Sequence, residues 1–157
     1  MESQDLQLLL HGRDSLLVLE TFDEPKALEL LISFFKTDPA PLYRWSITDG
    51  LELMGLSLAA TKNDVNTFAL EDALLQIKRQ SLQGIYVLCD AHPFLDEPKV
   101  VRLIKDILFN KVPAHKIILL SHAINLPTEL ARFAVKIPVA VPNDEEIMAL
   151  IREEAEL

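Results

Sequence analysis

The chain has one cysteine, fewer basic than acidic residues and no long apolar run, and each shortage excludes a class of protein. The single cysteine among 157 residues, Cys89, cannot form an internal disulfide, which indicates a reducing, cytoplasmic setting. The net charge is −9, whereas binding to phosphate backbones needs a basic surface, so we expect no nucleic-acid partner. No apolar run approaches the roughly 18 residues that span a bilayer, and the N-terminus lacks the basic start of a signal peptide. We therefore expect no insertion into a membrane.

What the chain does contain is the composition of a folded domain. Half of its residues are hydrophobic and a quarter are charged. A chain of this length can bury about two-thirds of its unfolded surface in one core. We therefore treat residues 1–157 as a single domain.

Apolar runs alternate with segments of helical periodicity along the chain. The runs predict five buried strands, at residues 15–21, 42–47, 85–90, 116–121 and 133–138. Residues 51–54 alternate weakly and fit a short hairpin strand beside residues 42–47. Strands that alternate with helices are typical of a mainly parallel sheet with helices on both faces. The predicted fold is a three-layer α/β sandwich with a five-stranded sheet.

Helix signals fall between and beyond these strands. A short N-terminal helix from Leu6 would end at Gly12, and a C-terminal helix would run from Asn143 to Leu157. Between them, the candidate N-caps of three further helices are Thr21 or Asp23, Asn66 or Thr67, and Asp96.

The connection after the first strand, residues 20–26, lacks the features of a phosphate loop. Such a loop needs glycines, so that backbone amides can approach phosphate closely. This connection has no glycine, three carboxylates and Pro25, which has no N–H group. Lys26 alone does not make up for them. We expect no phosphate loop here.

Asp90 ends the third strand, where ligands often bind in open α/β sheets. It has two interpretations, a turn residue that accepts backbone N–H groups or a functional acid. His92 follows it, but the other histidines show no metal-ligand spacing with it. We therefore favour the turn for Asp90, expect the ring of His92 to pack or hydrogen-bond locally, and predict no metal site.

An alternative constellation resembles a phosphoacceptor receiver domain, which places acids, an Asp, a hydroxyl and a Lys at successive strand ends. The matching residues here are Glu20, Asp23, Asp90, Ser121 and Lys136. The step from Asp90 to Ser121 suits this pattern. The step from Glu20 to Asp90 is too long for it, and Lys136 is not followed directly by proline.

Several blocks of the sequence resemble a known family. They are residues 43–48, 73–77, 87–95, 117–121 and 126–130, and the most specific is Asp90-Ala-His-Pro-Phe-Leu95. In this order they resemble the N-terminal region of the Ycf-type AAA ATPases of cyanobacteria and algal plastids.

The resemblance implies a degenerate AAA-type α/β domain with strand order 5-1-4-3-2, ahead of an ATPase module that would begin after about residue 157. Asp90 would match the acid that ends the Walker B strand, and Ser121 the sensor-like end of the fourth strand. The chain departs from an active ATPase because it lacks the Walker A loop, the Walker B glutamate and an identifiable arginine finger. The resemblance also makes the plastid stroma a possible location.

The resulting expectation is a non-catalytic AAA-like module that binds a protein partner, itself or an AAA ATPase domain. It has no catalytic residue and no cofactor, and only Asp90 and Ser121 are weak candidates for ligand binding. Residues His92, Pro93, Phe94 and Leu95 are expected to form a structural turn or a docking surface. The alternatives are a receiver-like phosphoacceptor and an unusual nucleotide-binding domain that uses Asp90.

Overall fold

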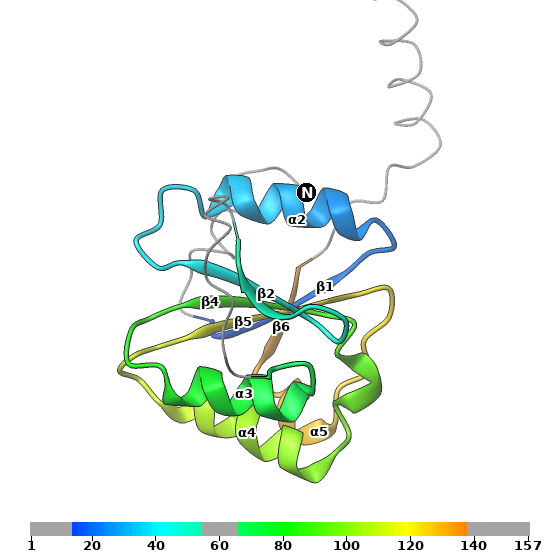
Figure 1. Ribbon diagram of the computed structural model, residues 1–157. Coiled ribbons are helices and arrows are strands. Elements are labelled where there is room, and N and C mark those ends of the chain that lie inside the picture. Colours follow the sequence, from blue (N-terminus) through cyan, green and yellow to red (C-terminus); the bar gives the residue numbers. More distant parts are fainter. Residues whose placement is uncertain (1–13, 55–65, 138–157) are drawn as a thin grey trace, which may run out of the picture.

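A computed structural model describes residues 14–54 and 66–137 of the chain. They form a three-layer α/β domain in which helix α2 lies on one face of a sheet and helices α3, α4 and α5 lie on the other (Figure 1). The three-layer α/β prediction is confirmed. The predicted helices at residues 6–12 and 143–157 lie outside the described residues.

The sheet has six strands in the order β3-β2-β4-β5-β1-β6. The prediction of five strands in the order 5-1-4-3-2 is therefore wrong for the sheet as a whole. The sixth strand is β3, which pairs antiparallel with β2 at the edge, while all other pairs are parallel. The strands are β1 Leu16–Glu20, β2 Leu42–Ser46, β3 Gly50–Leu53, β4 Ile85–Cys89, β5 Lys116–Ser121 and β6 Ala134–Ile137.

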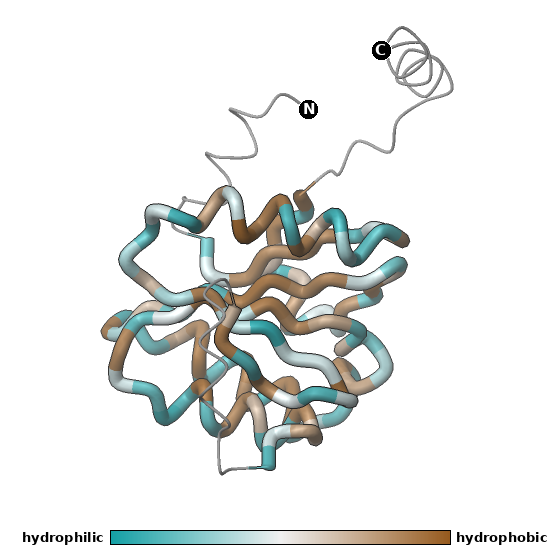
Figure 2. Tube along the Cα trace, turned by 45° about the horizontal axis from the view of Figure 1, so that its top comes forward, coloured by the Kyte–Doolittle hydropathy of each residue, from teal (hydrophilic) through white to brown (hydrophobic). Residues whose placement is uncertain are grey.

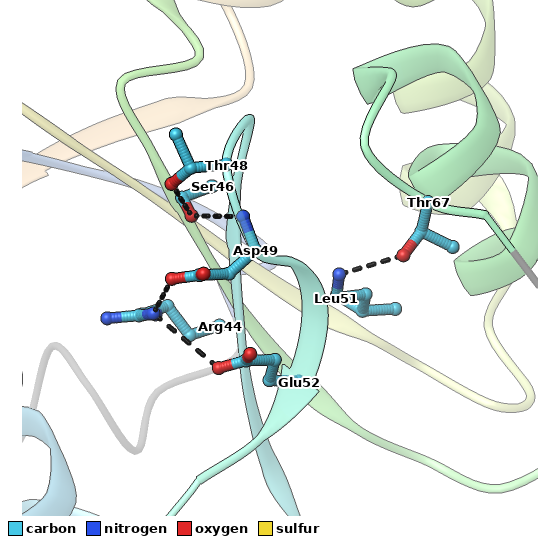
Figure 3. A network of polar contacts seen from close by, with 7 residues as sticks. All are labelled: Arg44, Ser46, Thr48, Asp49, Leu51, Glu52 and Thr67. Carbon is cyan, nitrogen blue, oxygen red and sulfur yellow. Dashed lines mark hydrogen bonds and ion pairs between the residues drawn. The ribbon is translucent and has the colours of Figure 1, made fainter. Parts of the chain in front are cut away.

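The β2–β3 hairpin explains why three of the weakly alternating residues 51–54, those at 51–53, lie in a strand. Gly50 has a positive φ of 71°, which lets the chain reverse without the strain that a side chain would bring. Behind the turn, the indole N–H of Trp45 donates to the carbonyl of Thr67 at 2.8 Å, and the N–H of Leu51 donates to the Thr67 hydroxyl at 2.8 Å. On the other face, Arg44 pairs with Asp49 and Glu52 (Figure 3).

The described helices are α2 Glu24–Phe34, α3 Leu70–Arg79, α4 Pro98–Phe109 and α5 Thr128–Ala131, with a short 3-10 helix η1 at His92–Phe94. N-caps were predicted for α2, α3 and α4, and two of these three helices begin at another residue than predicted. Asp23 caps α2 by accepting the N–H of Lys26 at 3.2 Å.

Neither predicted side-chain cap forms at the other two helices. The N-cap of α3 is Ala69, because the Thr67 hydroxyl is used by the hairpin. The N-cap of α4 is Glu97 rather than Asp96, and its side chain makes no capping bond.

The core consists of two apolar layers divided by the sheet. Leu16 and Val18 of β1 face the α3–α4 layer, and Leu17 and Leu19 face the α2 layer, as the alternation of side chains along a strand requires. Figure 2 shows apolar residues concentrated in the central strands. Within the described residues, no helix is both long and apolar enough to cross a membrane.

Candidate functional site

The carboxyl ends of β1, β4 and β5 bring the predicted site residues to one edge of the sheet. Glu20 is in register with Ser121, and Cys89 with Leu120. Beyond the strands, the N–H of Thr21 donates to the carbonyl of Ser121 at 2.8 Å, and that of Asp90 to the carbonyl of Leu120 at 3.0 Å. This edge is where open α/β sheets usually bind ligands.

Ser121, Asp90 and His92 form one hydrogen-bonded cluster at this edge. The Ser121 hydroxyl donates to Asp90 Oδ1 at 3.3 Å and lies 2.8 Å from His92 Nδ1. A serine has only one hydroxyl hydrogen, so the two contacts can both be hydrogen bonds only where that hydrogen goes to Asp90 and Nδ1 of His92 donates to Ser121. Ser121 is buried, whereas Asp90 is exposed.

This geometry differs from that of a serine nucleophile. In a Ser-His-Asp triad the histidine accepts the hydroxyl proton and the acid orients the histidine. Here Asp90 is hydrogen-bonded to Ser121, whereas the acid of a triad is hydrogen-bonded to the histidine. The cluster is suited to fixing the loop after β4 onto the end of β5. Asp90 itself has a positive φ of 54°, a conformation that Asp tolerates better than most residues.

Two aromatic side chains that the sequence analysis did not identify extend the cluster. The ring of His122 meets that of His92 edge-on at 5.0 Å and stacks on Phe22 at 5.5 Å. Phe22 is 89% exposed. Phe22 follows Thr21, and His122 follows Ser121, two residues already considered. Their place just past two adjacent parallel strands is the signal that could have identified them.

The connection between β1 and α2 occupies the place where a phosphate loop would lie. The backbone N–H of Lys26, in the first turn of α2, donates to the chain's own Asp23 carboxylate, and Pro25 contributes no N–H. Glu20, at the end of β1, pairs with Lys136 of β6 at 3.0 Å. The lysine that the receiver interpretation requires is therefore in an ion pair with Glu20.

Cys89 ends β4 on the α2 side of the sheet and is buried. Burial, and next the nearby Glu24, raises the pKa of its thiol to about 12. A thiol of that pKa is a poor nucleophile and metal ligand at neutral pH. Across the described ranges, no three His, Cys, Asp or Glu side chains are grouped so that they could hold a metal ion.

Residues 92–95 form the turn after Asp90. Leu95 is buried, and the ring of Phe94 packs edge-on against that of Trp45 at 6.4 Å. Pro93 is exposed. One side of this turn therefore packs into the core, and the other faces solvent beside the histidine pair.

A mostly parallel sheet in this strand order, with an acid after β4, is consistent with an AAA-like α/β domain. The sequence matches the family described as SpoVK-like AAA ATPase, N-terminal domain, over residues 2–139, and the chain belongs to this family. The resemblance to the N-terminal domain of an AAA ATPase is thereby confirmed. No curated protein matches the chain.

Proposed function

We propose that this domain is a non-catalytic interaction module of an AAA ATPase, and that it neither binds nor hydrolyses nucleotide. The observation that carries the proposal is the contact between Asp23 and the backbone N–H of Lys26, at the start of α2. In phosphate-binding proteins this helix end faces the phosphates with free amides and positive charge. Here the chain's own carboxylate fills that place.

The side chains around the helix start add to this argument. Glu20 and Glu24 bring further negative charge, which repels phosphate, and Lys136 is held by Glu20 rather than left for a ligand. Phe22, between the acids, presents an apolar ring to solvent. A surface of this kind is better suited to a protein partner than to a polyphosphate.

The residues after β4 support a role without catalysis. Ala91 and His92 stand where an ATPase would place its catalytic glutamate, and Nδ1 of His92 lies 2.8 Å from the hydroxyl oxygen of Ser121. The two positions after Asp90 therefore carry no carboxylate that could activate water. We propose that the domain precedes an ATPase module, as in the Ycf-type AAA ATPases, in the cytoplasm or plastid stroma, and that it contacts this module, another protein or itself.

Isothermal titration of the 157-residue chain with ATP and Mg²⁺ tests the proposal. We expect no binding at micromolar concentrations and no phosphate release, with an active phosphate-loop ATPase as the positive control. An Asp90→Asn variant should give the same flat titration. Micromolar binding with turnover by the unmodified chain would refute the proposal.

The hydrogen bond between Ser121 and Asp90 favours a second candidate, a receiver-like phosphoacceptor. Beryllofluoride or acetyl phosphate would then shift the NMR signals of the loop after Asp90 in the unmodified chain and not in the Asp90→Asn variant. Unchanged spectra in both proteins would retire this candidate. The pairing of Lys136 with Glu20 makes unchanged spectra the expected result.

A further inference from the structure

Exposed apolar side chains gather at the amino ends of the strands, opposite the candidate site. Leu82 is 79% exposed, Val112 88% and Phe109 51%. The ring of Phe109 meets that of Phe133 edge-on at 5.6 Å. We call Leu82, Phe109, Val112 and Phe133 the amino-edge patch.

His115 holds part of this patch in a fixed arrangement. Its Nδ1 accepts the N–H of Gly84 at 3.1 Å, and its Nε2 lies 3.2 Å from the carbonyl of Gln80. The segment that carries Val112 is thus fastened to the segment that carries Leu82. The two most exposed members of the patch therefore sit on neighbouring loops joined by a buried side chain.

The rim of the amino-edge patch is basic. Arg79, Lys111 and Arg132 are exposed and form no ion pair with another described residue. The guanidinium of Arg132 lies 5.4 Å from the centre of the Phe133 ring. Residues 79–84, 109–116 and 131–134 contain no Asp or Glu. The carboxylates of Asp14 and Asp38 lie near Lys116. Burial lowers the pKa of Lys116, and these two carboxylates raise it by less.

The opposite edge of the sheet carries the complementary charge. Phe22 and His122 stack there in the open, and exposed carboxylates lie on the same strand-end loops. These acids are Asp23, Asp90, Asp96 and Glu97. We call Phe22, His122 and these four acids the carboxyl-edge patch. The loops that carry it, residues 20–26, 90–98 and 121–127, contain Lys26 as their one basic residue other than histidine.

Helix dipoles explain the signs of these charges in part. The helices begin at the carboxyl edge, where acids are favoured, and end at the amino edge, where bases are favoured. The dipoles do not explain why Phe22, Leu82 and Val112 face water, since burial of each would be favourable. Apolar side chains inside rims of opposite charge are typical of two surfaces that bind each other.

We infer that the amino-edge patch of one copy binds the carboxyl-edge patch of a second copy, head to tail. The inference rests on the proposed function and specifies the partner as this same domain. Because the two patches lie at opposite ends of the parallel strands, each association leaves a free patch on both copies. Such heterologous contacts build a ring where the rotation closes and an open chain where it does not.

Sedimentation velocity of the 157-residue chain at rising concentration tests this inference. We expect mass to grow with concentration at low salt and association to weaken at high salt, because exposed charges are screened. A basic-edge variant, Lys111→Glu with Arg132→Glu, and an acid-edge variant, Asp96→Lys with Glu97→Lys, should each associate about tenfold more weakly. Mixing the two variants should restore association. The acidic amino edge of the first variant then meets the basic carboxyl edge of the second, and their unaltered edges can form the original contact.

Matched controls separate loss of the interface from loss of the fold. Arg102→Glu with Lys105→Glu makes the same charge change on α4, breaks the ion pairs with Asp106 and Glu129, and should associate normally. Leu82→Ser should weaken association, whereas Leu30→Ser, in the middle of α2, should not. Circular dichroism reports whether each variant folds.

Three results would overturn the inference. They are a chain that stays monomeric at every concentration, association that both edge variants retain, and variants whose mixture fails to associate. Monomeric behaviour would leave the amino-edge patch to an acidic segment of another protein. Nucleotide titration of the same samples tests the proposed function separately, so the two ideas can fail independently.

Discussion

The hydroxyl oxygen of Ser121 lies 2.8 Å from Nδ1 of His92 and joins the end of β5 to the turn that follows β4. The same hydroxyl lies 3.3 Å from Asp90, and a serine has one hydrogen for the two contacts. We predict that this hydrogen goes to Asp90, so that Nδ1 of His92 donates to Ser121. A histidine that donates to serine cannot act as its base, so the tautomer of His92 separates a structural contact from a nucleophilic site.

Replacing Ser121 with alanine should lower the free energy of unfolding by about 1 kcal/mol, since two hydrogen bonds of a buried hydroxyl are lost. Urea denaturation followed by circular dichroism measures the change, and Ser46→Ala, at a half-buried serine of the β2–β3 hairpin, is the comparison. Nitrogen-15 NMR of the unmodified protein should show His92 protonated on Nδ1. A hydrogen on Nε2 alone would contradict the assignment of donor and acceptor.

Replacing Trp45 with phenylalanine should destabilise the domain by about 2 to 4 kcal/mol. The indole is fully buried, and its N–H satisfies the carbonyl of Thr67, which would be left without this donor. Thr67 also holds Leu51, so the loss should loosen the β2–β3 hairpin. Urea denaturation measures the change. Tyr43→Phe, at a half-buried ring of the same strand, should cost less, and an equal cost would argue against the hydrogen bond.

The central parallel strands β1, β4 and β5 were predictable because each is an apolar run covered on both faces, as in Ile85–Cys89. Strand β3 was missed in the count because its exposed outer residues, Glu52 and Leu53, give no clean alternation. The cap of α3 was mispredicted for a tertiary reason. There the Thr67 hydroxyl bonds to Leu51, a partner distant in sequence that local capping rules do not consider.

The candidate site was predictable to the extent that strand order determines which loops meet. Asp90 and Ser121 end adjacent strands, so their contact follows from the topology that the resemblance implied. The stacking of Phe22 on His122 depends on where two loop side chains turn, which periodicity does not encode. Phe22 was therefore passed over as one residue in a loop without glycine.

Cys89 should resist thiol reagents in the folded domain. Burial raises the pKa of its thiol to about 12, and the reaction requires the thiolate. We expect no labelling by a disulfide reagent at mildly alkaline pH and rapid labelling in urea. A Glu24→Gln variant should stay protected, because burial is the larger cause of the shift. Labelling of the native protein at the unfolded rate would refute this explanation.

His115 should make the domain less stable as the pH falls. Burial lowers the pKa of its imidazole in the folded state, and its Nδ1 accepts the N–H of Gly84, so the neutral ring is the one that fits. Below the ordinary histidine pKa of about 6.5 the unfolded chain binds a proton that the folded chain does not, so stability declines toward the lowered pKa. Above that window the contribution of His115 is fully present.

A His115→Asn variant tests this linkage. The asparagine side-chain oxygen can still accept from Gly84, while the titrating group is gone. We expect a loss of about 1 to 3 kcal/mol at neutral pH, from the lost contact with Gln80 and the smaller side chain, and a flatter decline in stability under mild acid. Urea denaturation of both proteins at a series of pH values measures the two slopes. If the slopes were equal, another group would be responsible for the acid sensitivity, and the protonation argument for His115 would be wrong.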